Sequence, residues 1–172
     1  VFALFLVSGL SAQVLLVEDF NYTAGDSLGA HGWTSFSGGN TNVLSVVSPG
    51  LTFTGYSGSG VGNAALVQTT GQDAYKPLNT PDSTGTFYIS MMVRVDSIKI
   101  AGDYFFALLP STSTTLYAAR LYAKDSSGLR FGIIKSTTSA GSLVYTPTTY
   151  SLGTTYLLVV KYKFNTGSTT DD

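Results

Sequence analysis

Residues 18–33, EDFNYTAGDSLGAHGW, hold the rarest chemistry-bearing side chains of the chain. Glu18, His31 and Trp33 each occur once among 172 residues. Hydrolysis of a glycosidic bond needs two carboxyl groups that flank the bond, but Glu18 has only Asp19 beside it, and adjacent residues on a strand face opposite sides. No serine lies in a GxSxG motif that would mark a hydrolase nucleophile. The sequence therefore predicts no catalytic residues and a protein that is not an enzyme.

The same segment has too few nitrogen and sulfur ligands to bind a transition metal. One histidine and no cysteine are too few ligands for zinc, so we expect His31 to be a turn residue and Trp33 to be a packing anchor for the first strand. Calcium prefers the hard oxygen atoms of loop carboxylates and amides. The calcium candidates are Asp19, Asn40, Asn42, Asp171 and Asp172. Their alternative role is that of solvated turn residues.

Sugar binding requires aromatic rings and a few planar polar groups on one surface. The predicted strands carry six such residues on their outward positions. The candidate ligand-binding residues are Tyr88, Arg94, Arg120, Tyr122, Lys161 and Lys163. They could line one concave sheet face, or they could be ordinary cross-strand pairs on a half-exposed sheet.

Composition limits the classes of partner. The chain is 44% hydrophobic and 11% charged, with a formal net charge of -1. Nucleic-acid binding is not expected, because it needs a clustered basic surface. With no cysteine, the chain has no disulfide and depends on the size of its core for stability.

Alternation of apolar and polar residues predicts an all-β, antiparallel sandwich or barrel. The two clearest strands are residues 86–96 and 156–164, in which every second side chain is apolar. Turn sequences rich in Gly, Ser and Asn separate several shorter windows. The shorter predicted strands are residues 14–20, 43–47, 51–53, 64–69, 104–109, 116–124 and 129–135.

The two ends of the printed sequence have their own predictions. Residues 1–12 are typical of the end of a secretory signal peptide, with a buried first strand as the alternative. They are too short to span a membrane, which takes about 20 apolar residues. We expect residues 13–172 to form one domain. The apolar strand at residues 155–165 needs neighbours on both edges. We therefore also expect that the C-terminal strands of this domain are missing and that further domains follow.

Four segments carry a family resemblance: EDFNYTAGDSLGAHGWTSFSGG, VSPGLTFTGYSGSGVGNAALVQ, GTFYISMMVRVDS and TTYLLVVKYKFNTGSTTDD. Together they resemble secreted bacterial proteins, mainly of the Bacteroidetes, that carry a laminin-G-like, concanavalin-A-like jelly roll. The resemblance implies a two-sheet antiparallel jelly roll, located outside the cell or at its surface. It also implies that a calcium site at a sheet rim is common in such folds.

The function expected from this resemblance is a non-catalytic extracellular binding or adhesion module. Its expected partner is a polysaccharide or cell-surface glycan, with calcium as a candidate cofactor. A carbohydrate-active enzyme or its accessory module is one alternative. A structural spacer in a large cell-surface protein is the other, and the fold alone does not choose among the three.

Overall fold

The computed structural model describes residues 13–79, 84–136 and 143–165. The predicted signal peptide at residues 1–12 and the calcium candidates Asp171 and Asp172 lie outside these ranges. The protein is all-β, with 39% of the described residues in strands and 3% helical. Within the described ranges, no helix has the length and hydropathy needed to cross a membrane.

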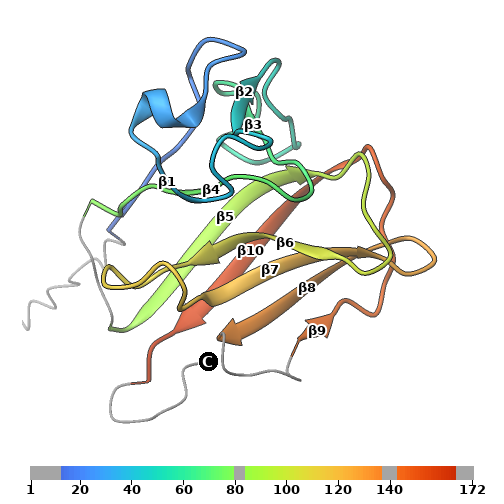
Figure 1. Cartoon of the computed structure of the whole chain (residues 1–172). Helices are drawn as coiled ribbons and strands as arrows, with labels where there is room; N and C mark the ends of the chain where they lie inside the picture. Colours follow the sequence, from blue (N-terminus) through green and yellow to red (C-terminus); the bar gives the residue numbers. More distant parts are fainter. Residues whose placement is uncertain (1–12, 80–83, 137–142, 166–172) are drawn as a thin grey trace, which may run out of the picture.

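Two antiparallel sheets form the larger part of the molecule (Figure 1). One sheet pairs β5 (Thr86–Arg94) with β10 (Thr155–Lys163) over nine residues. The other has the strand order β6-β7-β8-β9. Its strands are β6 (Asp103–Leu108), β7 (Ala118–Asp125), β8 (Leu129–Ser136) and β9 (Val144–Tyr145).

The sandwich core lies between these two sheets. Val160 and Tyr162 of β10 pack against Ala119 and Leu121 of β7, and all four are at most 7% exposed. A second cluster joins Ala123, Leu129 and Phe131 to the same interior. The inward-facing sides of β5 and β10 are those that the alternation in residues 86–96 and 156–164 predicted. The all-β antiparallel prediction is therefore confirmed.

A smaller unit precedes the sandwich and lies at the top of Figure 1. It begins with the 3-10 helix η1 (Leu28–His31) and contains two short antiparallel pairs. The pairs are β1 (Thr34–Ser37) with β4 (Asp73–Tyr75), and β2 (Ser45–Val47) with β3 (Ala64–Leu66). Leu28, Leu44 and Val46 form its own buried core.

Two predicted strands are wrong. Residues 14–20 form no strand, because Phe20 has a positive φ of 51° and Val14 and Val17 are 68% and 76% exposed. Residues 51–53 instead close a local loop, in which the Ser59 hydroxyl accepts a hydrogen bond from the Phe53 N–H. The strands at 43–47 and 64–69 exist but are shorter than predicted.

The edge of β10 is bordered by an open groove of about 460 Å³. Among the described strands, β10 pairs only with β5. Apolar side chains make up most of the groove, including those of Phe131, Ile133, Val144 and Leu157. The expectation that a further strand follows β10 concerns residues outside the printed sequence and stays a prediction.

Candidate functional site

The six predicted ligand-binding residues do not lie on one face. Tyr88, Lys161 and Lys163 occupy the outward positions of β5 and β10, and Tyr88 is directly opposite Lys161. Arg94 is also on β5, where Asp96 accepts two hydrogen bonds from its guanidinium group. Arg120 and Tyr122 are on β7, in the other sheet of the sandwich. Of the two alternatives, a single face shared by all six residues is excluded, because β5 and β10 belong to one sheet and β7 to another.

A row of tyrosines crosses the outward face of the four-stranded sheet. Tyr104 of β6 is the register partner of Tyr122, which is the partner of Gly132 on β8. Gly132 in turn is the partner of Tyr145 on β9. Because neighbouring strands are about 4.8 Å apart, these positions span about 14 Å across the sheet. We call Tyr104, Tyr122 and Tyr145 the tyrosine row.

Gly132 creates the space for the last ring of the row. A Cβ atom at Gly132 would lie 2.7 Å from Cδ1 of Tyr145, so the Tyr145 ring covers the position where a side chain would stand. Arg130 donates hydrogen bonds from Nη1 to the carbonyls of Thr146 and Pro147, both at 2.7 Å. These bonds attach the segment after β9 to β8 and fix the position of Tyr145.

Arg120 lies beside the other end of the row. Its Cζ atom is 4.9 Å from the ring centroid of Tyr117, 5.5 Å from that of Tyr104 and 5.7 Å from that of Tyr122. The preceding residue, Ala119, is fully buried and has a positive φ of 47° next to an irregularity in the β6–β7 register. Such bulges redirect neighbouring side chains. The backbone at Ala119 therefore helps to aim Arg120 at the rings.

Lys124 is the second cation of this surface. Its Nζ atom lies 3.9 Å from the centroid of the Tyr145 ring. Cations attract the faces of aromatic rings by about 0.5–2 kcal/mol. Arg120 and Lys124 are thus held on opposite sides of Tyr122 along β7, each by aromatic rings.

The hydroxyl groups of Tyr104 and Tyr145 stay protonated. Burial, a hydrogen bond with Tyr117 and the charge of Asp73 raise the pKa of Tyr104 far above its usual range. Burial and the neighbouring Tyr122 raise the pKa of Tyr145. Asp73, from β4 in the smaller unit, accepts hydrogen bonds from the hydroxyls of Tyr104 and Ser37. At neutral pH these tyrosines therefore present uncharged hydroxyls.

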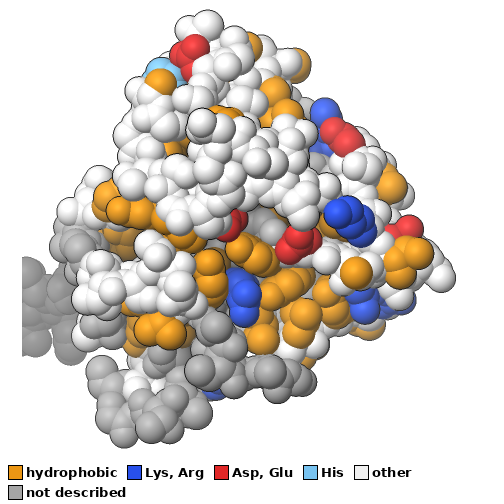
Figure 2. All heavy atoms as spheres, in the orientation of Figure 1, with side chains coloured by type: hydrophobic (Ala, Val, Ile, Leu, Met, Phe, Trp, Pro, Cys, Tyr) orange, Lys and Arg blue, Asp and Glu red, His pale blue; other side chains and the backbone are white. Residues whose placement is uncertain are grey.

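Figure 2 shows the outward face of this sheet. Hydrophobic side chains, a class in which tyrosine is included, gather over β6–β8, with basic side chains among them. Acidic side chains lie along the border nearest the smaller unit. The surface thus combines rings, cations and hydroxyls, which are the groups that bind sugar rings and their substituents.

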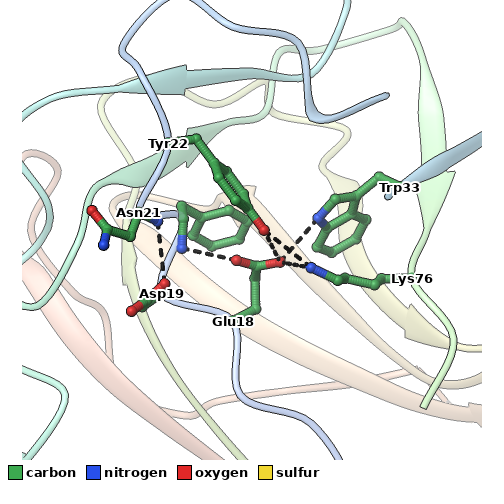
Figure 3. A network of polar contacts seen from close by, with 7 residues as sticks. Glu18, Asp19, Asn21, Tyr22, Trp33 and Lys76 are labelled. Carbon is green, nitrogen blue, oxygen red and sulfur yellow. Dashed lines mark hydrogen bonds and ion pairs between the residues drawn. The ribbon is translucent and has the colours of Figure 1, made fainter. Parts of the chain in front are cut away.

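Glu18 and Trp33 of the N-terminal segment belong to a separate polar network (Figure 3). Oε2 of Glu18 accepts hydrogen bonds from Nζ of Lys76 and, at 3.2 Å each, from the Tyr22 hydroxyl and Nε1 of Trp33. Oε1 accepts one from the backbone N–H of Phe20 at 2.9 Å. The Glu18 side chain is only 10% exposed. The sequence showed no second carboxyl group beside Glu18 for catalysis, and it did not identify these hydrogen-bond donors.

The pKa of Glu18 fits a structural role, in which its ionised carboxylate holds separate segments of the chain together. Burial raises the pKa of Glu18, but the hydrogen bonds from Lys76 and Phe20 outweigh it and hold the pKa below its usual value. A general acid in glycoside hydrolysis requires the opposite shift. The ionised carboxylate ties the N-terminal segment to Trp33 and to Lys76, which follows β4.

His31 is a partnered turn residue. It ends η1, and its Nε2 lies 2.8 Å from Oδ2 of Asp26. Its ring stacks on Tyr22 with centroids 3.9 Å apart and an angle of 4° between the planes. The predicted anchoring role of Trp33 is visible in its packing against the core of the smaller unit, next to Phe20.

The three predicted calcium ligands that the structure describes, Asp19, Asn40 and Asn42, are not gathered at one site. The Asp19 carboxylate accepts a hydrogen bond from the Asn21 N–H, and Asp19 lies against Gly62. Asn42 instead donates to the carbonyls of Thr69 and Thr70. Asn40 is an exposed residue of the β1–β2 connection. In the described ranges, no three His, Asp or Glu side chains gather as a metal site would require.

Sequence reasoning missed Tyr104, Tyr117 and Tyr145. Part of the row could have been predicted from the sequence. The short KDSSG turn between β7 and β8 fixes the register of these strands and places Tyr122 opposite Gly132. The position of Tyr145 had no such signal, since β9 contains only two residues and follows a longer connection. Comparison with known proteins adds no assignment: no family model, curated protein or solved structure matches the chain.

Proposed function

We propose that this protein is a non-catalytic extracellular binding module that binds polysaccharide on the outward face of the β6–β9 sheet. The observation that carries the proposal is the register of Tyr104, Tyr122, Gly132 and Tyr145 across four strands. Rings that lie across a sheet offer successive contacts to a linear chain of sugar rings. The jelly-roll class and the secreted or cell-surface location belong to the same proposal and rest on the sequence resemblance.

The physical basis is the match between surface and ligand. Sugar rings have C–H-rich faces that pack against aromatic rings and hydroxyl groups that pair with planar polar groups. Arg120 and Lys124 supply N–H donors, while the protonated tyrosine hydroxyls can both donate and accept. A rigid sheet holds these groups in place, which lowers the entropic cost of binding.

The test is glycan binding by the whole chain and by two matched variants. We expect Tyr122→Ala to weaken binding about fivefold, because a stacked ring contributes about 1 kcal/mol. Tyr88→Ala is the control, since Tyr88 is 71% exposed on the other sheet. Affinity electrophoresis or calorimetry against a panel of neutral and acidic polysaccharides measures both, with calcium and with a chelator.

Three outcomes would contradict the proposal. One is the absence of binding to every polysaccharide in both conditions, which would favour a structural spacer. Another is an equal loss of binding in Tyr88→Ala and Tyr122→Ala. The third is release of sugars from any polymer of the panel, which would make the protein a carbohydrate-active enzyme.

A further inference from the structure

The two cations beside the tyrosine row have no carboxylate partner. Neither Arg120 nor Lys124 takes part in any ion pair of the described residues. The Nε atom of Arg120 is buried and, within the same ranges, has no hydrogen-bond partner. Both side chains are held by tyrosine rings. Their charges are therefore positioned but not neutralised.

Two other cations of the described residues are paired with carboxylates. Lys76 pairs with Glu18, and Arg94 pairs with Asp96. Arg130 donates from Nη1 to two backbone carbonyls, although its Nε atom, like that of Arg120, is buried without a hydrogen-bond partner among the described residues. An unpaired charge that is partly removed from water is unfavourable unless a ligand compensates it. The contrast points to a ligand that brings negative charge to Arg120 and Lys124.

The spacing of the two cations fits a polymer with repeated charges. On β7 each cation is two residues from Tyr122, and therefore about 7 Å from it along the strand. An arginine held flat by rings can bind a carboxylate or sulfate with two parallel hydrogen bonds. Asp73 is one acidic group at the border of this surface, and its carboxylate already accepts hydrogen bonds from the hydroxyls of Ser37 and Tyr104.

We infer that the ligand of the tyrosine row is an anionic polysaccharide whose carboxylate or sulfate groups bind Arg120 and Lys124. This inference rests on the proposed function and narrows its ligand class. Single-stranded nucleic acid also combines charge with stackable rings. The formal net charge of -1 argues against it, since a polyphosphate needs a larger basic surface.

The experiment compares polymers that differ only in charge. Polygalacturonate is matched with its methyl ester, in which the carboxylates are blocked, and dextran sulfate is matched with dextran. An oligothymidylate serves as the nucleic-acid probe. We expect binding to one or both acidic polymers at least tenfold tighter than to the neutral partner, and weakening as salt rises. A preference for polygalacturonate over its methyl ester would indicate recognition of carboxylates. A preference for dextran sulfate over dextran would indicate recognition of sulfates.

The variants test the two named residues. We expect Arg120→Gln combined with Lys124→Gln to reduce affinity for the acidic polymer about tenfold and to remove the preference over the neutral polymer. Lys161→Gln combined with Lys163→Gln is the control, because it removes the same charge from the other sheet. Thermal unfolding identifies any variant that fails to fold, and Arg120→Lys with Lys124→Arg, which keeps both charges, should retain the preference.

The outcomes separate this inference from the proposed function. Equal binding of neutral and acidic polymers would overturn the inference but leave polysaccharide binding in place. No binding to any polymer would overturn both. Tighter binding of the oligothymidylate, or an equal loss in the Lys161 and Lys163 control, would also overturn the inference.

Discussion

Glu18 shows how a single carboxylate can organise a segment that forms no strand. Residues 14–20 lack a strand partner, yet Glu18 connects them to Trp33 and to Lys76, which is 58 positions away in the chain. Hydrogen bonds to a charged group each contribute about 1.5–3 kcal/mol. Sequence reasoning could identify Glu18 as unusual, but it could not identify Lys76, because no local pattern records such a distant contact.

Replacing Glu18 tests the strength of this anchor. We expect Glu18→Gln to lower the free energy of unfolding by about 1–3 kcal/mol, because Lys76 loses its counter-charge and the donors around Oε2 lose an ionised acceptor. Denaturant unfolding at pH 7 measures the loss. Asp96→Asn is the control, since the Arg94–Asp96 pair is exposed and should contribute less than about 1 kcal/mol.

The same anchor has a defined pH dependence. The folded pKa of Glu18 is below its ordinary value of 4.5, so the unfolded chain binds the proton more readily. The stabilisation is thus fully present above pH 4.5 and is lost as the pH falls through the lower folded pKa. The difference in stability between wild type and Glu18→Gln should shrink over that range. A difference that stays constant from pH 7 to pH 3 would argue against an ionised Glu18.

Among the elements, the long strands could be predicted from the sequence and the short ones could not. Strands β5 and β10 contain nine residues each, and their alternation identified both the strands and their buried faces. Strands of two to four residues, such as β1, β4 and β9, are too short to carry a period. Most of the sandwich was therefore predictable, whereas the pairings of the smaller unit were not.

Gly132 provides a test of how β8 and β9 build the tyrosine row. We expect Gly132→Ala to displace Tyr145, because the new Cβ would lie 2.7 Å from the ring, and to weaken polysaccharide binding severalfold. Gly29→Ala is the matched control, since its Cβ would make only an ordinary contact 3.8 Å from Oγ of Ser27. Binding and thermal unfolding are measured together. Unchanged binding in a folded Gly132→Ala protein would remove Tyr145 from the site.

At the scale of the whole molecule, the described residues form two separate cores. Leu28, Leu44 and Val46 form one core, and the sandwich has its own. Hydrogen bonds from Tyr104 to Asp73 and between Tyr56 and Ser90 connect the two units. Because Asp73 belongs to the smaller unit and Tyr104 to the tyrosine row, the smaller unit contributes to the border of the candidate site.

Amide hydrogen exchange should resolve the two units. We expect the slowest exchange in β5, β7, β8 and β10, where the paired segments contain eight or nine residues. The three-residue pairings of the smaller unit should open locally at a lower free energy and exchange faster. Exchange at one common rate in both units would indicate that they unfold only together.

Alternate residues of β7 serve different roles, one set in the core and the other on the outward surface. Ala119, Leu121 and Ala123 face the interior, while Arg120, Tyr122 and Lys124 lie on the outward face with the rings of the other strands. Because alternate residues of a strand face opposite sides, we expect substitutions at the outward positions to leave the packing between the sheets intact. A change of ligand preference therefore requires no redesign of the core, and β7 is a suitable starting point for directed evolution of new binding specificities.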